Sequence, residues 1–179
     1  MQTTSRKIDG TDNSELQAKA QYDSIIEFIS ALDVDHDELD SLRDDVEYCI
    51  DAVNDAIEAG QSIAYEMQAL HTAIEAYNEM QEEAGEFESY DEAYEQAIDN
   101  ALEVQVRSDW CSVGEEMEAG EFYILLCTGG PTVRIRGELN GGTVIRAWLE
   151  HQDWGTSWAQ YYDASGDTLV QYAQMFFPG

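Results

Sequence analysis

Apolar side chains recur at intervals of three and four residues through the first part of the chain, the period that places them on one face of an α-helix. Ser14 has the side chain of a helix N-cap, Asp35 or Asp37 can cap a second helix, and Gly60 is suited to a C-terminal cap. Short connections favour antiparallel neighbours, which predicts helical hairpins or a small bundle. The predicted helices cover residues 15–32, 36–58, 61–83 and 90–104.

The predicted helix at 36–58 carries two stripes of opposite chemistry. Its apolar residues follow the helical period: Leu39, Leu42, Val46, Cys49, Val53 and Ile57. Acidic residues follow the same period: Asp40, Asp44, Glu47, Asp51, Asp55 and Glu58. Because each residue advances about 100° around the axis, the two stripes lie about 160° apart. One face is therefore predicted to be packed, and the other to be an exposed row of carboxylates.

The pattern changes after residue 107, where apolar and polar residues alternate as they do in strands. The motif Asn140-Gly141-Gly142 predicts a tight hairpin. The predicted fold is α+β, with an N-terminal helical region, a small antiparallel sheet and a C-terminal helix. Strands are predicted at 121–127, 132–139, 143–150 and 154–162, and the last helix at 166–177. The predicted parts are a flexible leader at 1–14, an acidic helical region at 15–107 and a sheet domain at 108–179.

Charge separates this chain from an average globular protein, because 38 acidic residues and 8 basic ones give a net charge of −30. Residues 1–107 hold 28 acids and 5 bases, whereas residues 108–179 hold 10 acids and 3 bases. Direct binding to DNA, RNA or anionic lipid is disfavoured at such a charge. A solvated helix face or adaptation to high salt would also explain the acidity, although adaptation should coat both parts of the chain.

Membrane insertion and secretion are not expected from the sequence. The longest apolar run, Phe122–Cys127, is too short to span a bilayer, and the N-terminus lacks the apolar segment of a secretory signal. Three cysteines without a CxxC pair are typical of free thiols in a reducing cytosol. We therefore expect a cytoplasmic protein without a cofactor, and the sequence leaves its oligomeric state open.

The acidic row on the second helix motivates the main functional hypothesis. A helix of 23 residues rises about 34 Å, close to one turn of B-form DNA. Phosphates lie about 3.4 Å apart along each DNA strand, so such a row can occupy a basic cleft that normally holds nucleic acid. The predicted contact residues are Asp37, Asp40, Asp44, Glu47, Asp51, Asp55 and Glu58, supported by Glu79, Glu82, Glu83, Glu86 and Glu88.

Three motifs follow one another in the second part of the chain: TGGP at 128–131, RIRGEL at 134–139 and LEHQDWGTSW at 149–158. With these motifs, the stretch 125–162 resembles a small domain of orphan proteins from phages, plasmids and integrative elements. The resemblance implies no established chemistry. It implies a context, because mobile elements commonly encode antirestriction and anti-CRISPR proteins, many of them small and strongly acidic. The acidic helices lie outside this match.

Aromatic residues offer a second contact surface in the predicted sheet domain. On one strand at 154–162, alternation would place Trp154, Trp158 and Tyr162 on the same side, either as an interface or as a core face under the final helix. A basic cluster on the polar face of adjoining strands also has two interpretations, pairing with the helical acids or contact with a partner. Its members are Arg134, Arg136 and Arg146.

Asp33-x-Asp35-x-Asp37 resembles the start of an EF-hand calcium loop, but the pattern then fails. Glu38 stands where the loop needs glycine, and Asp44 stands where it needs glutamate. A helix cap is therefore the favoured interpretation, and no metal site is predicted.

Cys127, His151 and Asp153 supply the residue types of a thiol nucleophile with an oriented base. Nothing in their spacing brings them together, and no catalytic site is predicted. The predicted function is non-enzymatic inhibition of a nucleic-acid-binding defence protein, such as a Cas effector or a restriction-modification enzyme, by occlusion of its basic cleft. The alternative is an acidic adaptor or assembly protein that binds a basic partner through the aromatic sheet.

Overall fold

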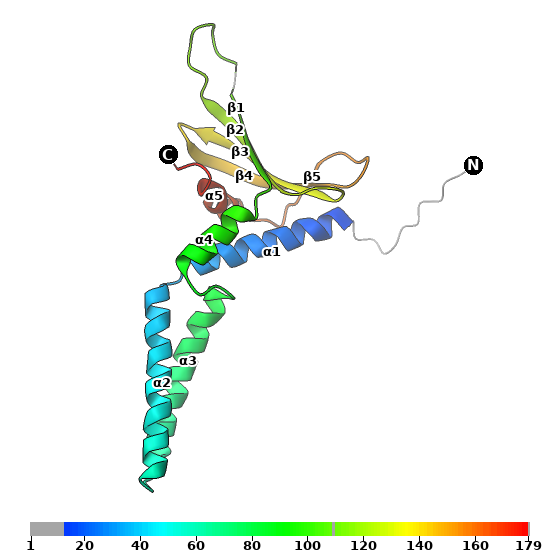
Figure 1. Ribbon diagram of the computed structural model, residues 1–179. Coiled ribbons are helices and arrows are strands. Elements are labelled where there is room, and N and C mark those ends of the chain that lie inside the picture. The colour runs from blue at the N-terminus through cyan, green and yellow to red at the C-terminus, as the bar shows by residue number, and fades with distance from the viewer. Residues whose placement is uncertain (1–12, 109, 179) are drawn as a thin grey trace, which may run out of the picture. The chain divides into compact units, whose positions relative to one another are not determined.

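The computed structural model describes residues 13–108 and 110–178, and its fold is α+β, as the sequence predicts (Figure 1). Four helices precede a five-stranded antiparallel sheet, and a further helix follows it. The predicted leader at 1–14 lies mostly outside the described residues, and its last two residues belong to the first helix. The helices are α1 (Asn13–Asp33), α2 (His36–Glu58), α3 (Ala64–Ala84), α4 (Tyr90–Asp99) and α5 (Gly166–Gln174).

The chain forms two compact units whose boundary differs from the expected one at 107/108. Of the described residues, 13–29 and 96–178 form a sheet unit, and 30–95 form a hairpin unit. The first part of α1 belongs with the sheet because Ala18, Tyr22 and Ile25 are buried in the same core as the strands. The charge and the helical period of the sequence suggest that α1 belongs with the other helices. Long-range packing instead makes its first part a member of the sheet unit.

The hairpin unit consists mainly of α2 and α3, which run side by side (Figure 1). Helix α2 has the predicted bounds, and Asp35 is its N-cap, with Oδ1 accepting a hydrogen bond from the Glu38 N–H at 3.1 Å. Val34, Leu39 and Ala84 form a small core with Tyr77 and Met80 packed against it. In a pair of helices, each helix covers only a narrow stripe of the other. The helical period of apolar residues therefore predicts more buried residues on α2 and α3 than the structure has. Ile57 of the predicted apolar stripe on α2 is exposed, and Met67 and Ile74 are exposed on α3.

The sheet is a meander in which every neighbouring pair of strands is antiparallel. The predicted hairpin is confirmed: Asn140 pairs with Thr143 across Gly141 and Gly142, whose φ angles of 57° and 83° are those of a type I′ turn. The strands, in spatial order, are β1 (Glu103–Ser108), β2 (Ala119–Cys127), β3 (Thr132–Asn140), β4 (Thr143–Gln152) and β5 (Ala159–Gln160).

Two predicted elements need correction. Helix α4 ends at Asp99, not at residue 104, because the next segment pairs with β2 as strand β1. Val104 and Val106 carry the alternation of a strand, and cross-strand pairing overrides the helical period there. The predicted strand at 154–162 is reduced to the two residues of β5, since the chain turns at Trp154 and Gly155.

One face of the sheet forms the main core, and α1 and α5 lie on that side (Figure 1). Polar contacts fix these helices: the Tyr22 hydroxyl accepts from the Ser165 N–H at 2.7 Å, and Gln174 Oε1 accepts from the Val144 N–H at 2.8 Å. The second contact also occupies a backbone donor of β4. The fully buried residues of this core include Ile25, Ile124, Val133, Ile135, Leu149, Leu169 and Tyr172.

Candidate partner-binding surfaces

The first candidate surface is the acidic face of α2, which we define as the seven carboxylates predicted from the sequence. All seven are exposed, and they lie on the side of α2 away from buried Leu39 and Val53. The one ion pair found on this face among the described residues joins Arg43 to Asp40 at 2.9 Å, with both side chains more than half exposed. The members are Asp37, Asp40, Asp44, Glu47, Asp51, Asp55 and Glu58.

The supporting acids of α3 do not extend that face. Glu79 and Glu82 are exposed on the side of α3 away from Met80 and Ala84, which pack inside the hairpin. Since each acidic row points away from its own packed stripe, the rows occupy opposite flanks of the hairpin. Glu83 is also exposed on α3, and Glu86 and Glu88 are exposed in the connection to α4.

The charge of the hairpin unit is almost entirely of one sign. Residues 30–95 contain 21 acidic residues and one basic residue, Arg43. Like charges four residues apart on a helix, such as Asp40 with Asp44 and Asp51 with Asp55, destabilise it by a few tenths of a kcal/mol per pair. The row is therefore kept at a cost in helix stability.

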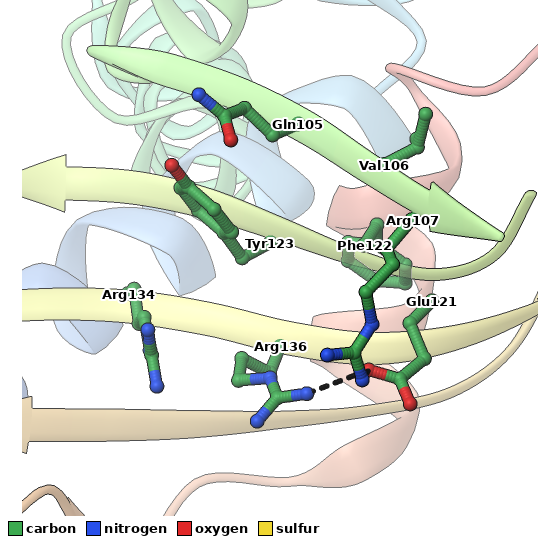
Figure 2. Close-up of a pocket in the computed structure, with 8 residues that line it drawn as sticks. All are labelled: Gln105, Val106, Arg107, Glu121, Phe122, Tyr123, Arg134 and Arg136. Atoms are coloured by element: carbon green, nitrogen blue, oxygen red, sulfur yellow. Dashed lines mark hydrogen bonds and ion pairs between the residues drawn. The ribbon is translucent and has the colours of Figure 1, made fainter. Parts of the chain in front are cut away.

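The second candidate surface is the polar sheet face, opposite the main core. Figure 2 shows Arg107 and Arg136 converging on Glu121, at 2.5 and 2.8 Å from its Oε2. The hydrogen bond from Arg107 is the main reason that the pKa of Glu121 lies below its ordinary value. A cavity of about 410 Å³ opens beside these groups, and Gln105, Tyr123 and Arg134 also line it.

Aromatic rings and guanidinium groups alternate across the polar sheet face. The Arg134 guanidinium lies 3.8 Å from the centre of the Trp158 ring and also pairs with Glu150 at 2.7 Å. The guanidinium groups of Arg136 and Arg146 lie 5.6 and 5.3 Å from the centre of the Trp148 ring. The Nε1 of Trp148 donates to Glu150 Oε1 at 2.9 Å. A guanidinium over an aromatic ring is attracted to it electrostatically, and Trp and Arg are the side chains enriched in interface hot spots.

The predicted aromatic row is not formed. Trp154 lies in a turn beside Gly130, where a Cβ would collide with the indole ring. Trp158 precedes β5 and stacks on Arg134, whereas Tyr162 is exposed beyond β5. The strand that would have aligned the three rings is too short to do so.

The basic cluster pairs with glutamates of the same sheet. Arg134 pairs with Glu150, Arg136 with Glu121, and Arg146 with Glu138 at 3.7 Å. Arg107 and Glu121 are not among the predicted site residues, because the predicted helix at 90–104 covers the start of β1 and hides its pairing with β2. The alternation of polar and apolar residues in Glu103-Val-Gln-Val-Arg107 is the feature of the sequence that indicates this strand.

Cys127 and His151 do not form a nucleophile and base. Both align with Val133, from β2 and β4 on either side of β3, so their backbones are about 10 Å apart. His151 is buried with Nδ1 2.8 Å from Ser14 Oγ. Burial also raises the pKa of the Cys127 thiol, which opposes formation of a thiolate nucleophile.

Asp153 and Ser14 both have structural roles, and that of Ser14 differs from the predicted N-cap. Asp153 Oδ1 accepts from the Trp154 N–H at 2.7 Å and organises the turn after β4. Ser14 is not the N-cap, because α1 already includes Asn13; it is a buried partner of His151. Within residues 13–108 and 110–178, no three His, Cys, Asp or Glu side chains are arranged to hold a metal ion.

Comparisons of the chain with family models, curated proteins and solved structures found no match. None of the described helices combines the length and apolar character needed to cross a membrane.

Proposed function

We propose that the protein is a non-enzymatic inhibitor of a nucleic-acid-binding defence protein, and that its hairpin unit imitates nucleic acid. The observation that carries the proposal is the acidic face of α2: seven exposed carboxylates along one continuous helix of 23 residues. Such a helix is about 34 Å long, close to one turn of B-form DNA. A basic cleft that binds phosphates can accept this row in their place.

The location of the charge favours a dedicated surface over general adaptation to salt. The hairpin unit has a net charge of −20, from 21 acids and one base. Four arginines of the sheet unit are held instead by Glu121, Glu138 and Glu150. Among the described residues, the Arg43–Asp40 pair is the one ion pair on the acidic face of α2, so most of its carboxylates keep their charge. Charge of one sign steers association with a basic partner.

The expected partners are Cas effectors and restriction-modification enzymes, whose clefts are built to hold nucleic acid. The resemblance of residues 125–162 to mobile-element proteins supports an anti-CRISPR or antirestriction role in the cytoplasm of a bacterial host. Direct binding to nucleic acid forms no part of the proposal, because the net charge of −30 opposes it.

A charge-matched pair of variants tests the proposal. The first variant changes the seven acids of the α2 face to Asn or Gln. The control changes seven exposed acids of the sheet unit in the same way: Glu15, Glu27, Glu115, Glu116, Glu118, Asp163 and Asp167. Both lose the same net charge, so only position distinguishes them. Targets are recovered from bacterial lysate at low and high salt and competed with duplex DNA.

We expect the α2 variant to lose target binding by at least tenfold while the control retains it, and duplex DNA to displace the wild-type protein. Binding should weaken steeply with salt, because the screening length is about 8 Å at physiological ionic strength. Equal binding by both variants, each with an unchanged circular dichroism spectrum, would exclude mimicry by α2.

An adaptor that binds through the polar sheet face is the second candidate function. The observation in its favour is the set of paired Arg and Trp side chains there, with Trp148 and Trp158 as anchors. Four arginines and four glutamates make this face neutral, so a strongly basic partner is no longer favoured. Replacing Trp148 and Trp158 by alanine should abolish adaptor binding, whereas neutralising α2 should leave it intact.

A further inference from the structure

We propose that strand β1 is a homodimer interface, at which it pairs antiparallel with β1 of a second copy and extends the sheet across a twofold axis. The strand occupies one edge of the sheet, since the order is β1-β2-β3-β4-β5. Five of its six residues are exposed. An edge strand presents unpaired backbone N–H and C=O groups, which are a template for a further strand.

The opposite side of the sheet shows how an edge is closed in this protein. Strand β5 has only two residues, and beyond it β4 meets polar groups from elsewhere in the unit. Gln174 Oε1 accepts from the Val144 N–H, and the Tyr161 N–H donates to the Leu149 carbonyl at 2.9 Å. Strand β1 contains no proline, and its pairing with β2 is regular from Glu103 to Arg107.

The β1 edge also exposes apolar side chains. Val104 and Val106 share a face with Ile124 and Phe122, yet they are 38% and 56% exposed, and neighbouring Leu102 is 58% exposed. Valine favours strands because its branched side chain packs against cross-strand neighbours. A second strand at this edge would provide such neighbours.

The sequence of β1 is complementary to itself in one antiparallel register. With Gln105 opposite Gln105, Glu103 faces Arg107 of the second copy and Val104 faces Val106. Directly opposite side chains in antiparallel strands lie about 4.5–5.5 Å apart, close enough for ion pairs and apolar contact. A parallel arrangement in the same alignment would instead place Glu103 against Glu103 and Arg107 against Arg107.

Existing contacts are compatible with this pairing. Arg107 is 71% exposed while it bonds Glu121, and a guanidinium has five donors, so it can also bind the second copy's carboxylate. Glu103 is exposed, with Tyr123 and Gln105 donating to its oxygens. Charged residues on an edge normally discourage pairing with foreign strands. Here the same residues select an identical strand.

Charge reversal tests both the interface and its register. E103R places Arg opposite Arg107, and R107E places Glu opposite Glu103, so each variant alone should be monomeric. The double variant E103R/R107E restores complementarity and should dimerise. A mixture of the two single variants should form a heterodimer, because every cross pair is then Arg with Glu. Mass is measured by sedimentation at matched protein concentration.

R146E is the matched control, since Arg146 is an exposed sheet arginine on β4, paired with Glu138 and distant from β1 in strand order. It should dimerise like the wild type. Because each copy carries a charge of −30, dimerisation should strengthen when moderate salt screens their repulsion. Target binding through α2 should instead weaken when salt is added. The opposite salt dependences distinguish failure of the dimer from failure of the proposed function. A monomeric wild type, or a folded mixture that fails to associate, would overturn the inference.

Discussion

Buried polar side chains illustrate, at the scale of single residues, how the sheet unit holds its helices. Tyr172 is fully buried on α5, and its hydroxyl donates to the Ala97 carbonyl at 2.8 Å and receives a longer contact from Asn100 at 3.4 Å. Ser14 and His151 form a second buried pair. An unsatisfied buried polar group costs about 1–3 kcal/mol. The Tyr172 bond therefore fixes α5 against α4, and the Ser14–His151 pair fixes α1 against β4.

The buried hydroxyl of Tyr172 makes the stability of the sheet unit depend on alkaline pH. Burial raises the pKa of Tyr172 from 10.0 to about 12. The neutral form is favoured in the folded state, so its stabilisation is complete below pH 10 and is lost as pH rises through about 12. The loss amounts to roughly 2–3 kcal/mol. Y172F should lower the free energy of unfolding at neutral pH by about 1 kcal/mol, but its stability should fall less between pH 10 and 12.

Urea unfolding followed by tryptophan fluorescence measures this effect, because all four tryptophans lie in the sheet unit. Y162F is the control, since Tyr162 is exposed and its replacement should leave the free energy of unfolding unchanged. Parallel alkaline profiles for the wild type and Y172F would contradict the assignment.

At the scale of elements, β3 depends on a glycine in its interior. Gly137 lies opposite Phe122, and a Cβ at this position would collide with the Phe122 ring and the Arg146 carbonyl. The aromatic ring occupies the space that a side chain on β3 would need. Glycine normally weakens a strand interior, so its presence here indicates close approach of the neighbouring ring.

G137A should therefore destabilise the sheet unit by about 1–3 kcal/mol, because the Phe122 ring and the Arg146 carbonyl of β4 both have to move within a packed core. G166A is a suitable control: its Cβ would meet the Ala147 carbonyl at an ordinary 3.7 Å. Urea midpoints from tryptophan fluorescence distinguish the two. Equal midpoints would show that the Phe122 ring and the Arg146 carbonyl move aside at no cost in stability.

At the scale of the whole molecule, charge and burial are distributed unequally between the two units. The hairpin unit carries −20 of the net −30, and its core is small, whereas the sheet unit contains the large core. Self-repulsion opposes the folded state in proportion to this charge, and salt screens it.

The hairpin unit should consequently unfold before the sheet unit at low ionic strength, with a midpoint that rises as sodium chloride is added. Far-ultraviolet circular dichroism reports mainly the helices, and tryptophan fluorescence reports the sheet unit alone. The gap between the two thermal transitions should narrow with salt. Coincident transitions with one salt response would show that the units unfold together.

The sequence by itself determined the α+β class, the bounds of α2, the β3–β4 hairpin and the acidic face of α2. These follow from local rules: the helical period, a capping aspartate, and two glycines that adopt positive φ. The positions in the acidic row needed no tertiary information, because one regular helix fixes the direction of every side chain on it.

Tertiary structure alone decided which helix belongs with the sheet, where α4 ends and β1 begins, and which groups pair on the polar sheet face. Arg107 and Glu121 meet across strands, and Ser14 and His151 are joined from opposite ends of the chain. Such contacts depend on strand order and register, which a local pattern does not encode. The edge position of β1 is also a property of the assembled sheet. The opposite charges of Glu103 and Arg107, in contrast, can be read from the sequence alone.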